Sequence, residues 1–387
     1  MDDIIYFDNA ATSWPKPPEV RAALDDYFGP AGGNPGRSGH RMSIRAAQTV
    51  EGARDEIAEL LGVDDPTRIV LTKNATEGLN LAIYGVLQPG DHAITTSIEH
   101  NSVMRPLRHL ASETIELTVV GCNPDGTLDP SAVRDAIRPT TRLITTLHGS
   151  NVMGSVLPIA EIAGIAAEAG ILYLVDAAQT AGVFPIDAPS LGLDLVAMTG
   201  HKGLLGPTGT GALYVREGIE LPPFMRGGTG SRSDLELQPD FMPDSLESGT
   251  LNVAGYAGLA AGVRHLLERG IETVLAHERT LVERFLAGAA EIPGITVYGP
   301  ESIGDRCGVL SFNVDGLTSS EVGTLLDQRY GIMSRVGLHC APGAHRTIGT
   351  FPTGTVRFGL SIFNTPDEID ASLDAIAEIR AWAVSHA

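Results

Sequence analysis

The sequence predicts an α/β protein built around a large, mostly parallel sheet of seven strands. Between residues 50 and 215, short apolar runs bounded by turn residues alternate with stretches of helical period. Several of these runs are apolar on both faces, as strands covered by helices on both sides should be. The 387 residues exceed the roughly 250 to 300 that one core usually serves, so a second, smaller α+β domain is expected at the C-terminal end.

The apolar runs give the order of the expected elements. Seven segments are predicted strands: 68–72, 92–96, 115–120, 142–147, 171–175, 194–198 and 211–215. The predicted helices of the same part of the chain are 76–86, 158–169 and the segment that ends before residue 60. Strands separated by crossover helices are typical of a parallel sheet.

The pattern changes after residue 252. Two long helical stretches, 254–269 and 271–290, are followed by alternating short strands and helices. Thr318 with Glu321 and Thr365 with Glu368 each have the spacing of a capping box, which predicts two further helix starts. The glycine-rich segment 227–249 is too long and too polar for an ordinary connection, so we expect an irregular functional loop there.

Composition narrows the class of function. The chain has 27 Lys and Arg against 47 Asp and Glu, a formal charge of -20, which disfavours nucleic-acid and membrane-surface partners. Three cysteines without C-x-x-C spacing, an N-terminus without a signal-peptide pattern and the lack of a long apolar run predict a cytoplasmic protein. Two classes of function are therefore left: a soluble enzyme and a protein-binding module.

Polar residues follow the predicted strands where ligands bind in doubly wound sheets. Asp176 follows one strand, Thr199 to Lys202 follow another, and Thr76 opens the helix after a third. A lysine, a carboxylate and donors for a phosphate form the set that pyridoxal phosphate requires. Each signal is ordinary alone, but G-x-x-x-x-G-K-[ST] and G-x-G-x-x-G, the signatures of a rival nucleotide site, do not occur.

The motifs, taken together and in order, resemble the class V aminotransferase family, and within it the Suf-type cysteine desulfurases. The resemblance covers nearly the whole chain and is carried by YFDNAAT (6–12), NATEGLN (74–80), EHNS (99–102), SNVMG (150–154), DAAQ (176–179), GHKGLLGPTG (200–209), ESGTLN (247–252), RVGLHCA (335–341) and VRFGLSIFNT (356–365).

This resemblance implies a fold type I transferase dependent on pyridoxal phosphate. Residues 16–264 are expected to form its large domain, and residues 1–15 and 265–387 the small one. Lys202 would join the cofactor as a Schiff base, Asp176 would hold the pyridinium nitrogen, and His100 would stack on the ring and move protons. The other implied cofactor contacts are Ala75, Thr76, Asn151, Gln179, Thr199, His201 and Thr250. Thr250 would come from a second subunit, which implies a homodimer with shared active sites.

The resemblance also implies a substrate and a nucleophile. Arg357, with Asn151 and Arg335, would bind the α-carboxylate of L-cysteine, since a guanidinium fork suits a carboxylate. The Cys340 thiolate would take the substrate sulfur as a persulfide, release alanine and pass the sulfur to an acceptor protein or a small thiol. Arg335 and His339 are expected to favour that thiolate. Cys122 and Cys307 are interpreted as bystanders, and no metal site is expected from His339, Cys340 and His345.

Alternatives stay open at this point. Selenocysteine lyase shares the scaffold, aminotransfer or epimerisation would leave Cys340 idle, and a non-catalytic scaffold would have no use for Lys202 and Asp176. Two departures from the Suf pattern also stand out. Leu338 replaces a histidine, and the segment between Gly228 and Glu247 is shorter.

Overall fold

The computed structural model describes residues 4–29, 32–36, 39–232 and 234–386. Its larger sheet has seven strands in the order β2-β8-β7-β6-β5-β3-β4, and only β8 runs antiparallel to its neighbours. The strands are β2 (Ile69–Thr72), β3 (His92–Thr96), β4 (Glu116–Val120), β5 (Thr141–Leu147), β6 (Leu172–Asp176), β7 (Leu195–Thr199) and β8 (Gly211–Val215). The predicted α/β class and seven-stranded, mostly parallel sheet are therefore confirmed.

Helices cover both faces of this sheet, and the side-chain alternation of each strand divides the core in two. One core joins residues such as Ile144 and Val196 to α2, α5, α6 and α7. The other joins residues such as Leu143 and Leu195 to α3 and α4 on the opposite face. These helices are α2 (Arg41–Leu60), α3 (Ala75–Val86), α4 (Asn101–Glu113), α5 (Pro130–Asp135), α6 (Ile159–Ala169) and α7 (Val253–Arg269). Of the two edge strands, β4 is partly exposed and β2 is buried.

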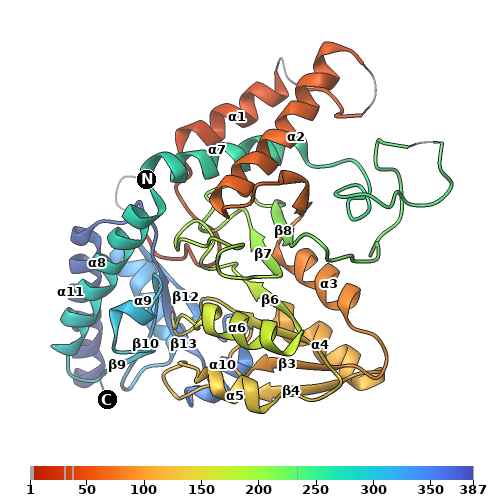
Figure 1. The fold of residues 1–387 in the computed structure, drawn as a ribbon. Helices are drawn as coiled ribbons and strands as arrows, with labels where there is room; N and C mark the ends of the chain where they lie inside the picture. The colour runs from red at the N-terminus through yellow and green to blue at the C-terminus, as the bar shows by residue number, and fades with distance from the viewer. Residues whose placement is uncertain (1–3, 30–31, 37–38, 233, 387) are drawn as a thin grey trace.

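A second, antiparallel sheet of four strands lies beside the first and is coloured blue in Figure 1. Its order is β12-β13-β10-β9, from β9 (Ile295–Tyr298), β10 (Val309–Val314), β12 (Arg335–Gly337) and β13 (Thr355–Gly359). Its core includes Phe312 and Phe358, whose ring centroids lie 5.0 Å apart. Helices α8 (Ile271–Ala290), α9 (Ser319–Tyr330) and α11 (Pro366–Ser385) contribute to this core, and both predicted capping boxes are present at the starts of α9 and α11.

The N-terminal segment packs beside the second sheet and forms a separate two-stranded sheet there. Strand β1 (Ile5–Tyr6) pairs in parallel with β11 (Ile332–Met333), and Phe7 packs on Phe358 with ring centroids 4.7 Å apart. The expected domain boundary between residues 264 and 265 falls inside α7 and stays a prediction. The remaining helices are α1 (Pro18–Phe28) and α10 (Pro342–Thr347), with single 3₁₀ turns at Pro66–Arg68 and Ile303–Asp305.

The described residues of 216–252 form neither helix nor strand, which confirms the irregular loop predicted at 227–249. In Figure 1 this segment, coloured green, extends away from the body of the protein. Several of its large apolar side chains are exposed: Phe224, Met225, Leu235, Leu237 and Phe241. None of the described helices combines the length and the apolarity that a membrane span would need.

Candidate active site

A cavity of about 280 Å³ opens beyond the carboxyl ends of the parallel strands. It brings together most of the residues that the sequence singled out: Ala75, Thr76, His100, Asn151, Asp176, Gln179, Thr199, His201, Lys202, Arg335, Cys340 and Arg357. The large sheet supplies the polar residues at its strand ends, while β12, β13 and the segment between β12 and α10 supply Arg335, Arg357 and Cys340. The cavity therefore lies between the two sheets.

Thr250 is the exception among the predicted site residues. It lines a different hollow, beside Lys73, Glu77 and Tyr256, and is not among the residues that line the cavity within this chain. The expected contribution of Thr250 to a partner's site stays a prediction.

Asp176 and Lys202 form the charged centre of the cavity. Asp176 ends the buried strand β6 and accepts a hydrogen bond of 2.9 Å from the Ala178 N–H. Burial raises the pKa of Asp176, and the nearby Lys202 ammonium opposes that rise. Burial also lowers the pKa of Lys202 to about 8, against the attraction of Asp176. Lys202 therefore exchanges a proton easily near neutral pH, as a lysine that reacts with a carbonyl must.

Two helix N-termini meet at one side of the cavity. Asn74 caps α3 by accepting a hydrogen bond of 3.0 Å from the Glu77 N–H. Thr76 Oγ1 lies 2.7 Å from Ser102 Oγ in the first turn of α4. Free N–H groups at helix starts favour an anion. Ser102 was not predicted as a site residue, although it lies only two residues after His100 in the EHNS motif.

Polar atoms without a partner point to a ligand that the chain alone does not provide. Among the described residues, Thr199 Oγ1, His201 Nδ1, Asn151 Oδ1 and Arg357 Nε are buried and have no hydrogen-bond partner. Buried polar groups in native proteins are nearly always paired, so Thr199 Oγ1, His201 Nδ1 and Arg357 Nε fit as donors to an anionic ligand, while the Asn151 oxygen can only accept a hydrogen bond from it.

His100 is held in one tautomer. Its Nδ1 accepts a hydrogen bond of 3.1 Å from the Ser102 N–H, so the proton of the neutral ring is on Nε2. Burial, with the positive charges of Lys202, Arg335 and Arg357, lowers the pKa of His100 to about 4. The ring is neutral at physiological pH.

Arg335 and Arg357 are partners across the antiparallel strands β12 and β13. The buried Arg357 donates from Nη1 to the Asn151 carbonyl over 3.1 Å and from Nη2 to Asp8 Oδ1 over 2.9 Å. Asp8 was not predicted as a site residue, although it lies in the YFDNAAT motif, because its partner is 349 positions away in the sequence. Asp8 and Asn151 hold the guanidinium in place.

Cys340 is exposed on a strained turn. Both His339 and Cys340 adopt positive φ angles, of 48° and 59°, which is uncommon for residues other than glycine and is typical of functional loops. The Asn101 N–H donates to the Cys340 carbonyl over 2.9 Å, and Asn151 Nδ2 donates to the His339 carbonyl over 2.6 Å. Arg335 Nη2 lies 3.9 Å from the Cys340 sulfur. The turn presents the thiol to the cavity and beside a cation.

The expected help from His339 is corrected by the structure. His339 Nε2 lies 3.0 Å from Thr355 Oγ1, and burial lowers the pKa of His339 to about 2. A neutral ring engaged elsewhere adds no positive charge beside the thiol, whereas Arg335 lies next to the sulfur and Lys202 and Arg357 also interact with Cys340 electrostatically. The rings of His339 and His345 are tilted by 42° with their centroids 5.4 Å apart, and no group of three potential metal ligands occurs among the described residues.

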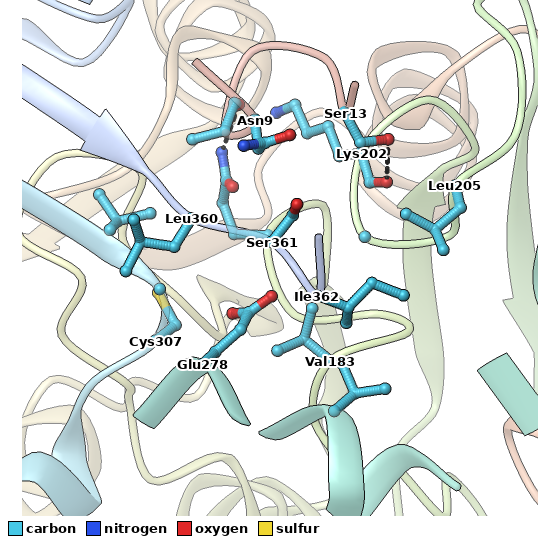
Figure 2. Close-up of a pocket in the computed structure, with 16 residues that line it drawn as sticks. Asn9, Ser13, Val183, Lys202, Leu205, Glu278, Cys307, Leu360, Ser361 and Ile362 are labelled. Carbon is cyan, nitrogen blue, oxygen red and sulfur yellow. Dashed lines mark hydrogen bonds between the residues drawn. The ribbon is translucent and has the colours of Figure 1, made fainter. Parts of the chain in front are cut away.

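The other two cysteines are poor nucleophiles. Burial raises the pKa of Cys122 to about 11 and that of Cys307 to about 12. Cys307 faces a small cavity behind the Lys202 loop, together with Glu278 from α8, as Figure 2 shows. Burial raises the pKa of Glu278 to about 8. In the same view, Ser13 donates a hydrogen bond of 2.8 Å to the Lys202 carbonyl.

Comparison with known proteins decides the family. The class-V aminotransferase family matches residues 5–371. The chain belongs to the class-V aminotransferase family. A probable cysteine desulfurase of Methanothermobacter thermautotrophicus is 37% identical over 98% of this chain and 95% of its own length. A cysteine desulfurase of Haloferax volcanii is 34% identical over 97% of this chain and 89% of its own length.

Solved structures of the family share the fold. The apo cysteine desulfurase of Thermococcus onnurineus superposes with a TM-score of 0.92 at 35% identity, covering 98% of this chain and 96% of that one. The Escherichia coli cysteine desulfurase CsdA superposes with a TM-score of 0.87 at 31% identity, covering 99% and 95%. The predicted class-V membership and fold type I architecture are thereby confirmed.

Proposed function

We propose that this class-V protein is a cysteine desulfurase that uses pyridoxal phosphate to convert L-cysteine to L-alanine and holds the sulfur on Cys340. The observation that carries the proposal is the placement of an exposed thiol, 3.9 Å from the Arg335 guanidinium, in the cavity that also holds Lys202 and Asp176. The names of the relatives support the same activity.

The residues of the cavity fit the cofactor. Thr76, the start of α3 and the unpartnered Thr199 Oγ1 and His201 Nδ1 would hold the phosphate. Asp176 would hold the ring nitrogen, Gln179 the phenolic oxygen, and Lys202 the aldehyde carbon, while His100 would stack on the ring and Ala75 and Asn151 would contact it. Bound in this way, pyridoxal phosphate supplies an electron sink for bonds broken next to the substrate amine.

The chain's own groups would orient the substrate and move protons. Arg357, fixed by Asp8 and the Asn151 carbonyl, has its Nε unpartnered and would bind the α-carboxylate, with Arg335 next to it. Lys202, whose pKa burial lowers to about 8, can accept and return a proton at Nζ near neutral pH. The neutral His100 would donate from Nε2.

Sulfur transfer balances without an external oxidant. The Cys340 thiolate forms an S–S bond with the substrate sulfur as the C–S bond of the substrate breaks. The electron pair of that bond stays with the carbon, which a proton converts to the methyl group of alanine. Cys340 is left as a persulfide, and a second thiol then takes the outer sulfur.

Aminotransfer and epimerisation give Cys340 no role, so its placement favours desulfuration over both. Selenocysteine lyase remains the nearest related activity, because the weaker C–Se bond needs less help from a thiol. The rates of the Cys340→Ala variant on cysteine and on selenocysteine separate the two activities. If the protein is a cysteine desulfurase, this variant should no longer convert cysteine to alanine.

Shared active sites are part of the proposal. Thr250 lines a hollow on the outside of this chain, near the exposed Phe224 and Met225. A second copy seated there would cover these side chains and bring its own cavity to Thr250. Sedimentation should give a dimer, and mixing Thr250→Ala with Lys202→Ala subunits should restore part of the activity that each variant alone has lost.

The test begins with the purified protein, pyridoxal phosphate and L-cysteine, which should yield alanine. Lysine occurs only at positions 16, 73 and 202. Borohydride reduction followed by peptide mapping therefore identifies which lysine is attached to pyridoxal phosphate. Modification of Lys202 is expected. Modification of Lys73 or Lys16, or amino-group exchange with keto acids in place of alanine formation, would overturn the proposal.

A further inference from the structure

A second hollow adjoins the reverse side of the Cys340 turn. It has a volume of about 600 Å³ and is bounded by α4, the end of β4 and α10. Pro342 and Gly343, which line it, begin two residues after Cys340. Asn101 also lines it and donates its N–H to the Cys340 carbonyl over 2.9 Å. The hollow is therefore anchored directly to the turn that carries the thiol.

Three exposed arginines surround this hollow: Arg105 and Arg108 from α4 and Arg346 from α10. Within the described part of the chain, none of the three forms an ion pair, and Arg346 only stacks on Phe351 at 4.2 Å. Arginines elsewhere, such as Arg45, pair with carboxylates. A cluster of unpaired cations is unexpected in a chain whose net charge is -20.

The carboxyl group that lines this hollow does not neutralise the cluster. Glu99 is 1% exposed and accepts hydrogen bonds from Thr96 Oγ1 and the Leu147 N–H. Burial raises the pKa of Glu99 to about 8, so its carboxyl is largely protonated at neutral pH. The field of the arginines also extends toward the active site, because Arg105 contributes to the lowered pKa of His100.

We propose that this hollow is the docking site for an acidic segment of the sulfur-acceptor protein, with glutamate or aspartate side chains placed within a few residues of the accepting thiol. The inference rests on the proposed function and names the partner of the same site. Opposite charges across an interface steer association and fix its register. Cys340 and Gly343 are three residues apart, at most about 10 Å, so an acceptor whose acidic residues lie two to four positions from its thiol would reach both.

The transfer step itself needs no further reagent. The acceptor thiolate attacks the outer sulfur of the Cys340 persulfide and forms a new S–S bond. The S–S bond to Cys340 breaks, its electron pair returns to the Cys340 sulfur, and the proton moves to whichever product is the stronger base.

The test uses two synthetic peptides, one with a cysteine flanked by glycines and then glutamates, and one with lysines in place of the glutamates. In spite of the overall charge of -20, the glutamate peptide should accept sulfur from the enzyme at least fivefold faster at low ionic strength. The preference should shrink at high salt, because salt screens exposed charges. A faster lysine peptide would overturn the inference.

Matched charge reversals locate the effect. Arg108→Glu should abolish the preference, whereas Arg269→Glu, the same change at an exposed position at the end of α7, should keep it. Equal effects of the two variants would contradict the docking site. Both variants should turn over cysteine with dithiothreitol at the unaltered rate, since Arg108 does not line the catalytic cavity.

A binding readout separates this inference from the proposed function. Fluorescence anisotropy of a labelled glutamate peptide with serine in place of cysteine requires no chemistry. Tighter binding to the unaltered protein than to Arg108→Glu, without any alanine production, would refute the desulfurase and keep the docking site. If alanine is produced but the peptide binds equally well to the unaltered protein and to Arg108→Glu, the docking site would be refuted and the desulfurase kept.

Discussion

The guanidinium of Arg335 lies 3.9 Å from the sulfur of Cys340. Strand β12 holds Arg335, and the positive φ of Cys340 turns the thiol back toward that strand. With the neighbouring His339 neutral, Arg335 is the cation that lies next to the sulfur. Under the proposed function, this relationship would let Arg335 act on the Cys340 thiol as well as on the substrate carboxylate.

Replacing Arg335 with alanine should slow the alkylation of Cys340. A charge pair at about 4 Å in watery surroundings is worth about 1 kcal/mol, so the rate with iodoacetamide at pH 7 should fall about fivefold. The rate at high pH, where the thiol ionises without help, should change little. Arg335→Lys, which keeps the charge, is the control, and an unchanged rate at pH 7 in Arg335→Ala would remove Arg335 from this role.

His100 should not produce an ionisation between pH 5 and 7. Its pKa is lowered to about 4 by burial, so the ring is neutral throughout this range. His100→Gln should lower kcat by about 10² to 10⁴ as expected for loss of a general acid–base group, without moving the acid limb of the pH profile. An acid limb near pH 6.5 that disappears in His100→Gln would show that the ring is protonated during turnover.

Glu278→Gln should stabilise the protein above pH 8. Burial raises the folded-state pKa of Glu278 to about 8, so between its unfolded value of 4.5 and pH 8 the folded chain keeps a proton that the unfolded chain loses. The wild type therefore loses stability as pH rises through that window, by a few kcal/mol, and the variant does not. In urea unfolding at pH 5, the wild type and Glu278→Gln should have similar midpoints. At pH 9, the midpoint of Glu278→Gln should be higher than that of the wild type. Parallel pH profiles of the two proteins would contradict the raised pKa of Glu278.

The buried pair Arg54 and Glu247 should be a stability determinant. Two hydrogen bonds of 2.6 and 2.7 Å join the side chains, and Glu247 also accepts from the Leu71 N–H. Glu247→Ala removes both hydrogen bonds to the carboxylate and leaves the buried Arg54 guanidinium only the Ile69 carbonyl and the exposed Glu51 as partners, so it should cost up to about 3 to 5 kcal/mol in the free energy of unfolding. The exposed pair Arg284 and Asp370 offers a control, because Asp370→Ala should leave the unfolding midpoint nearly unchanged.

The sequence predicted most of the fold because local patterns reflect local burial. Strands such as β6 and β7 are apolar at nearly every position since helices cover both of their faces. The strand order and the antiparallel direction of β8 follow from packing between distant segments, which no local pattern records.

Local patterns also account for which residues of the site could be predicted from the sequence and which could not. Asp176 and Thr199 were predicted because parallel strands end at one edge, where their polar successors meet. Asp8 was missed because its ion pair with Arg357 joins opposite ends of the chain. The role given to His339 was wrong because proximity in sequence says nothing about burial or about the hydrogen bond to Thr355.

The central claim is that Cys340 receives the substrate sulfur, and a single turnover of the holoenzyme with L-cysteine tests it most directly. Mass spectrometry of the Cys340 peptide, quenched without a reducing agent, should show the mass of one added sulfur atom in the same amount as the alanine formed. Cys340→Ala should form no alanine, while Cys122→Ser should behave as the unaltered protein. Alanine formed at the full rate by Cys340→Ala, or sulfur found only elsewhere, would contradict the account.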